Sequence, residues 1–383
     1  MPESSERDSR ELELRLFVSN VLWITRGWAA PEAIEATERA AALAERSGNL
    51  GQLISLVLTK GINALISGGP LAAGELADRA LDLALRDGNP IRIGVTHTFQ
   101  VMTRHTRGDL AGAEEYYSTG LKYFEDPGFR LTREPRMSTF AYASWNAWML
   151  GRPNVALERI SRQIVNDKNP YDVALSGFHK TLLLVYMRQY EHAEALAAQV
   201  LEVSEKNRIP NLAALSRCVL GHARARLGRA KDGVLLIRRG KADLLEMGAR
   251  DGVGRYTEFL AAAQGRDGAI VEALETVEQA LQANPDELAY RPEIFRTRGE
   301  LRLKREQTEV AEADFREAIA LAQKMGAKAW ELRATVSLAR LLGEQRRRDE
   351  ARVMLAEIYN WFTKGFDTAD VKEAKALLDD LSR

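Results

Sequence analysis

The sequence has 383 residues, 54 Lys and Arg balanced by 54 Asp and Glu, and 45% hydrophobic residues. This composition excludes collagen-like, disordered and disulfide-stabilised proteins, and the only cysteine, Cys218, cannot form a disulfide within the chain. The balanced charge gives no overall field that would attract nucleic acid or an anionic membrane, so we expect neither as a partner. A polar, acid-containing N-terminus and the lack of a long apolar run predict a cytoplasmic protein.

The dominant feature of the sequence is an internal repeat. A turn residue is followed about five positions later by a small residue, and seven positions beyond that by a second small or apolar residue. The first small position recurs with a period of about 40 residues, which gives nine units along the chain. In chain order the small positions are Ala33, Ala73, Ala113, Ala156, Ala193, Gly233, Ala273, Ala311 and Ala351.

Each unit predicts a pair of antiparallel helices. Seven residues are nearly two helical turns, so Ala273 and Ala280 lie on one face of a helix that a neighbouring helix can approach closely. A second amphipathic segment precedes each turn, as at 213–228. Prolines such as Pro170 and Pro210 fall between units, where helices begin or end. With no alternating strand pattern, the expected fold is all-α.

The longest step of the repeat, 43 residues, includes segment 125–135, whose two prolines predict a surface loop or a lid. At the other end of the chain, Asp367 is placed to cap a final helix. We therefore expect helical repeats over 1–366 and a C-terminal capping helix over 367–383. Since repeats of this kind contact only their neighbours, we expect stability to be a sum along the stack.

Two sets of residues carry a resemblance to a known family. Leu220, Gly221, Gly228, Gly233 and Gly240, and likewise Gly268, Ala273, Ala280 and Pro285, are similar to the tetratricopeptide pattern of Leu-Gly, turn, Ala, Ala and Pro. This resemblance implies a right-handed α-solenoid of about nine tetratricopeptide-like helix pairs with a C-terminal capping helix. Segments 143–153 and 337–381 resemble the C-terminal helical-repeat region of bacterial signalling proteins that carry a nucleotide cyclase and a STAND-type ATPase.

The sequence lacks the motifs that catalysis would need. The only Gly-Lys pair, Gly240-Lys241, is followed by Ala242 and lacks the preceding glycine of a phosphate-binding loop. The five histidines are not spaced as zinc ligands, and no nucleophile elbow or tuned pair of carboxylates is present. We therefore expect no catalytic residues, no metal and no cofactor, and predict that the protein is not an enzyme.

The resemblance also implies which residues line the concave face, because in that family the first helix of each unit supplies it. In that family the concave-face positions lie at fixed offsets from the small residue of each unit. Applied to this sequence, these offsets give an aromatic set in the middle of the chain: Phe99, Met102, His105, Tyr142, Trp145, Trp148, Phe178, His179 and Tyr186. They place a basic set toward the C-terminus: Arg226, Arg255, Arg266, Arg296, Lys304, Arg333 and Arg340, interspersed with Glu258, Glu293, Glu300 and Glu344.

Two interpretations of these sets remain open. In the first interpretation, the aromatic residues form an apolar binding site and the arginines bind carboxylates or phosphates of a ligand. In the second, the aromatic residues only pack between helices and the arginines pair with neighbouring glutamates. The first function hypothesis is a non-catalytic scaffold that binds a peptide or helix of a protein partner in its groove. The alternative is a ligand-sensing module of a signalling ATPase or cyclase, with a small-molecule effector.

Overall fold

The protein is an array of helices in the computed structural model, which describes residues 5–26, 31–47, 49–163 and 168–382. Within those ranges there is no β-strand, so the all-α prediction is confirmed. The helices are α1 Ser5–Arg26, α2 Pro31–Ser47, α3 Leu50–Ile66, α4 Pro70–Asp87, α5 Pro90–Thr106, α6 Leu110–Phe124, α7 Pro127–Leu131, α8 Glu134–Met149, α9 Pro153–Ser161, α10 Pro170–Tyr186, α11 Tyr190–Lys206, α12 Pro210–Arg226, α13 Ala230–Glu246, α14 Val253–Arg266, α15 Ile270–Gln282, α16 Arg291–Leu303, α17 Thr308–Met325, α18 Lys328–Glu344, α19 Arg348–Trp361 and α20 Ala369–Leu381.

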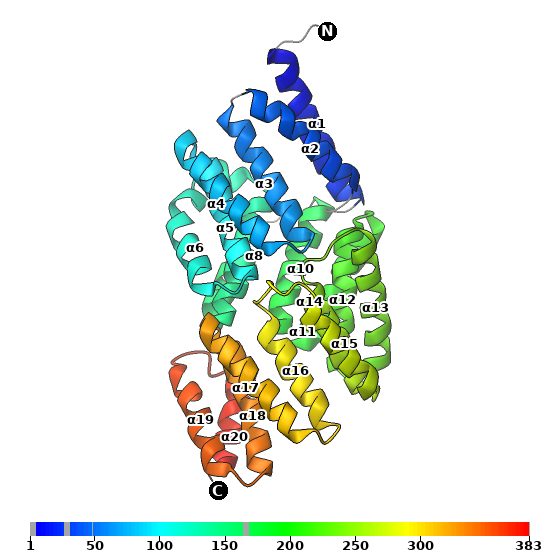
Figure 1. The fold of residues 1–383 in the computed structure, drawn as a ribbon, viewed down its shortest axis with the longest axis vertical. Coiled ribbons are helices and arrows are strands. Elements are labelled where there is room, and N and C mark those ends of the chain that lie inside the picture. The colour runs from blue at the N-terminus through cyan, green and yellow to red at the C-terminus, as the bar shows by residue number, and fades with distance from the viewer. Residues whose placement is uncertain (1–4, 27–30, 48, 164–167, 383) are drawn as a thin grey trace.

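Consecutive helices pack as antiparallel pairs, from α1 with α2 to α18 with α19, and the pairs stack side by side (Figure 1). The local sequence explains where many of them begin. The side chain of Asn169 accepts hydrogen bonds from the backbone N–H groups of Tyr171 and Asp172, and Pro170 occupies the first turn, where its missing N–H costs nothing. Glycines with positive φ, such as Gly228 (φ 90°) and Gly268 (φ 89°), provide the sharp turn between the two helices of a pair.

The small residues of the repeat lie where helices cross, as the spacing predicts. Wherever the structure describes their side chains, the alanines at these positions are fully buried. The one glycine in the series shows why: a Cβ atom on Gly233 would lie 2.5 Å from the carbonyl oxygen of Gly221 on the partner helix. The side chain of Ala33 falls outside the described residues.

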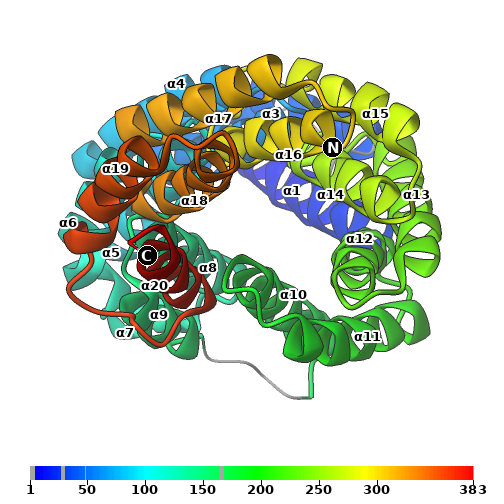
Figure 2. The same ribbon diagram turned by 90° about the horizontal axis from the view of Figure 1, so that it is seen from below.

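The stack curves into a superhelix whose successive turns contact each other (Figure 2). The backbone N–H groups of Arg250 and Asp251 both donate to the carbonyl oxygen of Ile66, at 2.7 and 3.0 Å, and the N–H of Leu288 donates to that of Thr106 at 3.0 Å. These partners are about 180 residues apart in the chain. The expectation that contacts join only neighbouring units is therefore wrong, because the curvature returns the chain to its own earlier turn.

Segment 125–135 lies at the surface, as its prolines predict, and most of its side chains are exposed, but one residue anchors it to the helices beneath. It contains the short helix α7, and Phe129 of that helix is fully buried, with its ring 5.2 Å from the ring of Phe124. A hydrogen-bonding Asp126 side chain caps α7. The segment thus packs on α5 and α6 and leads directly into α8.

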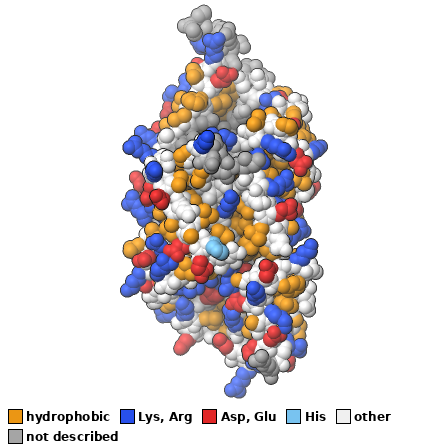
Figure 3. Space-filling view, turned by 180° about the vertical axis from the view of Figure 1, so that it is seen from behind, with side chains coloured by type: hydrophobic (Ala, Val, Ile, Leu, Met, Phe, Trp, Pro, Cys, Tyr) orange, Lys and Arg blue, Asp and Glu red, His pale blue; other side chains and the backbone are white. Residues whose placement is uncertain are grey.

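The outer surface is mixed in charge. On the face seen in Figure 3, Lys and Arg side chains are interspersed with Asp and Glu, and hydrophobic side chains gather toward the middle. In the part of the chain that the structure describes, no helix combines the length and the apolar character needed to cross a membrane.

Candidate functional site: two cavities inside the superhelix

Two cavities lie on the inner side of the helix pairs. One, the apolar cavity, has a volume of about 270 Å³ and is lined mainly by side chains of α3, α5, α8, α10 and α14. The other, the polar cavity, has a volume of about 230 Å³ and is lined by α12, α14, α16, α18 and α20, together with the turn after α10 and the start of α11. The first helices of successive pairs therefore supply most of both linings, and α20 adds to the polar cavity.

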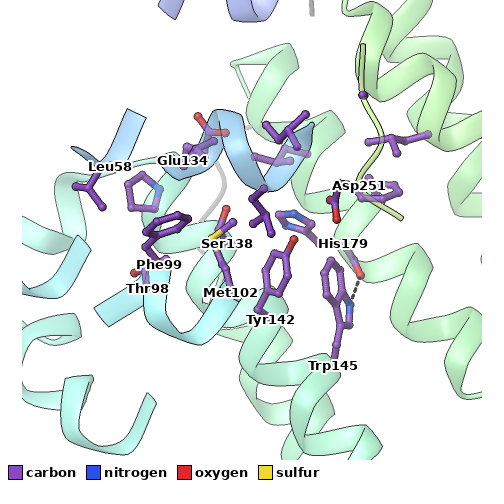
Figure 4. Close-up of a pocket in the computed structure, with 18 of the residues that line it drawn as sticks. Leu58, Thr98, Phe99, Met102, Glu134, Ser138, Tyr142, Trp145, His179 and Asp251 are labelled. Atoms are coloured by element: carbon purple, nitrogen blue, oxygen red, sulfur yellow. Dashed lines mark hydrogen bonds between the residues drawn. The ribbon is translucent and has the colours of Figure 1, made fainter. Parts of the chain in front are cut away.

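The apolar cavity brings together most of the aromatic set. Figure 4 shows Tyr142, Met102 and Phe99 around the same space, with Trp145 and His179 beside them. The indole nitrogen of Trp145 donates a hydrogen bond to the carbonyl oxygen of His179 at 3.2 Å, which joins α8 to α10. Of the predicted aromatic set, Phe99, Met102, Tyr142, Trp145, Phe178 and His179 line this cavity.

The histidines near the apolar cavity are uncharged at neutral pH. Burial lowers the pKa of His179 to about 3, and its Nδ1 lies 3.0 Å from the side-chain nitrogen of Gln163. Burial also lowers the pKa of His105 to about 4, although a hydrogen bond with Asn146 opposes the shift. His105 lines a smaller void of about 20 Å³ that shares Tyr142 and Trp145 with the apolar cavity. These imidazoles therefore add no positive charge to its wall.

A charged group lies at one end of the apolar cavity, on the second superhelical turn. Arg255 donates a hydrogen bond to the hydroxyl of Tyr186 at 2.7 Å, but its buried Nε has no hydrogen-bond partner. Asp251 lines the same wall, and burial together with nearby Glu287 raises the pKa of its carboxyl group to about 7, against the opposing effect of Arg255. The cavity thus combines apolar walls with the guanidinium group of Arg255 and the carboxyl groups of Asp251 and Glu134.

An aromatic cluster of Trp148, Tyr186, Tyr290 and Trp330 lies between the two cavities. Trp148 stacks on Tyr186 with ring centroids 5.1 Å apart, and Trp330 meets both Trp148 and Tyr290 edge-on. Tyr186 and Tyr290 also line the small void beside the apolar cavity. Trp148 and Tyr186, which the sequence placed in one binding groove with Trp145, therefore form a wall that divides the interior.

Arg333 closes this wall on the side of the polar cavity. Its guanidinium carbon lies 4.9 Å from the ring centroid of Trp148 and 5.1 Å from that of Trp330. The same group donates to the carbonyl oxygen of Tyr186 and to the carboxylate of Asp370, the latter at 2.7 Å. Tyr186 is thus contacted through its hydroxyl by Arg255 and through its carbonyl by Arg333, one arginine from each cavity.

The predicted basic set is divided between the cavities. Arg255 belongs to the apolar cavity, and Lys304 lines neither, because its Nζ donates to the carbonyl oxygen of Gly265 at 2.7 Å. The polar cavity is lined by Arg226, Arg266, Arg296, Arg333 and Arg340 of that set, together with Glu293 and Glu300.

Sequence reasoning missed Arg188, Tyr190, Asp370 and Glu373, which also line the polar cavity. The sequence does contain a signal for Arg188, because it occupies a turn position where several other units have glycine. In the structure it adopts the positive φ of that turn, 61°. Its side chain crosses to the next superhelical turn and pairs with Asp370, at 3.2 Å, and with Glu373. Nothing in the 40-residue period indicates that α20 supplies these carboxylates.

In the described part of the chain, no three His, Cys, Asp or Glu residues are grouped in a way that could hold a metal ion. Cys218 is buried, and burial raises the pKa of its thiol.

The fold was compared with known proteins. No family model and no curated protein sequence matches the chain. Among solved structures, a Rap protein complexed with Competence and Sporulation Factor is similar over 97% of this chain and 99% of that one, with 13% identity and a TM-score of 0.61. The chain has the tetratricopeptide-repeat fold.

Two further solved structures are similar to this tetratricopeptide-repeat chain. One is a STAND protein with a tetratricopeptide repeat sensor from Pyrococcus horikoshii, with 16% identity, 97% of this chain and 54% of that one covered, and a TM-score of 0.48. The other is a tetratricopeptide repeat protein from Parabacteroides merdae, with 18% identity, 72% and 98% coverage, and a TM-score of 0.38.

Proposed function

We propose that this chain is a non-catalytic interaction module that binds a short peptide segment of a protein partner inside its superhelix. The observation that carries the proposal is the apolar cavity, whose volume of about 270 Å³ exceeds the ~150 Å³ of an engineered apolar cavity that binds benzene. It can hold an apolar side chain of the partner. Pockets of this kind, with a few polar groups on apolar walls, are typical binding sites.

The polar groups of the apolar cavity favour a peptide over a pure hydrocarbon. The guanidinium group of Arg255 lines the cavity, and in the described residues its side chain makes a hydrogen bond only to the hydroxyl of Tyr186, so its other N–H groups have no protein acceptor. A peptide carries a backbone carbonyl within a few bonds of each apolar side chain. One peptide unit therefore supplies both an apolar group for the walls of the cavity and an acceptor for the guanidinium group of Arg255. The Rap protein whose fold is similar was solved in complex with Competence and Sporulation Factor.

One specific observation favours the alternative, a ligand-sensing module. The apolar cavity is lined from two superhelical turns, by Ile66 of α3 on one side and by Ala249, Asp251 and Arg255 on the other. An occupant contacts both turns at once. A small molecule there would change how the turns pack, and hence the curvature of the solenoid.

The test is affinity selection from a synthetic random pentapeptide library, read by mass spectrometry. Ser138 of α8 lines the apolar cavity, and Ser138→Trp fills it. Ser118→Trp is the matched control, because Ser118 is exposed on the outer helix α6. We expect the wild type and S118W to enrich peptides that share an apolar residue, and S138W to lose at least about tenfold in enrichment.

Equal enrichment by S138W, at an unchanged circular dichroism spectrum, would contradict the peptide site. If no peptide is enriched, native mass spectrometry of the purified protein tests the alternative. A small molecule retained by the wild type and S118W but lost from S138W would support the sensing module, and its absence would contradict that module.

A further inference from the structure

The polar cavity holds more positive than negative charge. Six arginines line it, Arg188, Arg226, Arg266, Arg296, Arg333 and Arg340, and they share it with four carboxylates, Glu293, Glu300, Asp370 and Glu373. Val336 is the only aliphatic side chain in this lining, so the cavity offers little to an apolar ligand. Its chemistry is that of a site for a charged group.

Four of the arginines neutralise the four carboxylates. Arg296 pairs with Glu293 at 2.6 Å and also with Glu300. Arg333 pairs with Asp370 at 2.7 Å. Glu373 accepts hydrogen bonds from both Arg188 and Arg340; burial alone would raise its pKa, but these bonds lower it to about 2.

Arg226 and Arg266 are left over. Neither makes an ion pair or a hydrogen bond within the described residues, although both line the cavity. The guanidinium of Arg226 lies over the ring of Tyr190, with its carbon 4.9 Å from the ring centroid. The pKa of Arg266 is lowered by burial and by the positive charge of Arg226. Glu300 and Glu293 interact electrostatically with Arg266 and Arg226, but neither lies within ion-pair distance of them, and both are already paired with Arg296. Two like charges thus face one small cavity without an ion pair of their own in the described residues.

We propose that the polar cavity binds a phosphate dianion, either free phosphate or the phosphate group of a small phosphate monoester, between Arg226 and Arg266. The two unpaired arginines together carry a charge of +2, and a phosphate monoester carries about −1.5 to −2 at pH 7, so the two charges match. A single carboxylate would neutralise only one of them. Guanidinium groups match the geometry of phosphate oxygens and bind them bidentately.

This site is separate from the proposed peptide site. The aromatic cluster of Trp148, Tyr186, Tyr290 and Trp330 lies between the two cavities, and no residue lines both the apolar and the polar cavity. The proposal therefore does not depend on what occupies the apolar cavity. Because Arg226 and Arg266 hold no carboxylate, replacing them leaves no buried charge without its partner.

Isothermal titration calorimetry at constant ionic strength tests the proposal with two probes, inorganic phosphate and phenyl phosphate. We expect wild-type protein to bind at least one probe, and Arg226→Gln combined with Arg266→Gln to weaken binding by about tenfold or more, since two charge-assisted contacts are lost. The matched control is Arg79→Gln with Arg305→Gln, two exposed arginines outside both cavities and without ion pairs. We expect this control to bind like the wild type.

Tighter binding of phenyl phosphate than of inorganic phosphate would identify a monoester as the ligand, and equal binding would identify the free anion. The proposal is overturned if neither probe binds, if the Arg226 and Arg266 double variant binds as tightly as the wild type, or if succinate binds as well as phosphate. Phosphate binding by S138W distinguishes the two sites, because we expect that variant to bind phosphate normally whatever happens to its peptide binding.

Discussion

The apolar and polar cavities are built by the same part of the repeat but differ in how far their side chains satisfy one another. In the polar cavity, Arg296, Arg333 and their carboxylates form a nearly closed network that fixes its shape. In the apolar cavity, most walls have no polar group to satisfy, and the space is left for an occupant. A position on the concave face is thus not enough to make a residue bind a ligand. The residue must also have groups that its protein neighbours leave unpaired.

The largest expected effect comes from breaking the aromatic cluster that divides the interior. Trp330 is fully buried among three other rings, and its indole nitrogen donates to the carbonyl oxygen of Ala289 at 3.0 Å. We expect Trp330→Ala to lower the free energy of unfolding by about 3–5 kcal/mol, measured by urea denaturation. Trp361→Ala is the control: Trp361 is 45% exposed, and we expect about 1 kcal/mol or less. Equal losses would show that the cluster has no special role.

The next effect separates paired from unpaired arginines within the polar cavity. Arg296→Gln removes the main partner of Glu293, which is only 6% exposed, and we expect a loss of about 3 kcal/mol. Arg226→Gln removes only a contact with the ring of Tyr190, so we expect about 1 kcal/mol or less. Both are measured by urea denaturation at one salt concentration. A large loss in R226Q would mean that Arg226 is structural and would count against a free anion site.

The smallest effect concerns pH and the apolar cavity. The pKa of Asp251 is raised to about 7 in the folded protein, so the folded state holds this proton more tightly than the unfolded state does. Its contribution to stability is therefore greatest below about pH 4 and is lost as pH rises toward 7. We expect the stability of Asp251→Asn relative to wild type to be higher at pH 8 than at pH 5, measured by urea denaturation at both values. No difference between the two pH values would mean that Asp251 is solvated.

The sequence predicted the local parts of this structure well. The small residues of the repeat specify helix crossings because a neighbouring backbone passes within contact distance of them, as at Gly233. The offsets from these positions also brought together Phe99, Tyr142 and Phe178 at one cavity. These features depend on contacts within one unit or between adjacent units.

What the sequence did not predict depends on contacts between superhelical turns. Trp145 and Trp148 are three residues apart and were expected to share one site, but Trp148 packs on Trp330 of the following turn. Asp370 likewise reaches Arg188, which is 182 residues away in the chain and lies on the other turn. The pitch of the superhelix is the sum of small rotations between successive helix pairs. The 40-residue period of the sequence does not reveal these rotations, so it cannot predict which units meet on adjacent turns.

The contacts between superhelical turns also restrict how the chain can change in length during evolution. Ile66 pairs with Arg250, and Thr106 with Leu288, only because a fixed number of units separates each pair. A unit inserted or deleted between them would shift every later inter-turn contact out of register and separate the walls of both cavities. We therefore expect insertions and deletions of whole units to be tolerated only near the two ends of the array, while the number of units in the middle stays fixed.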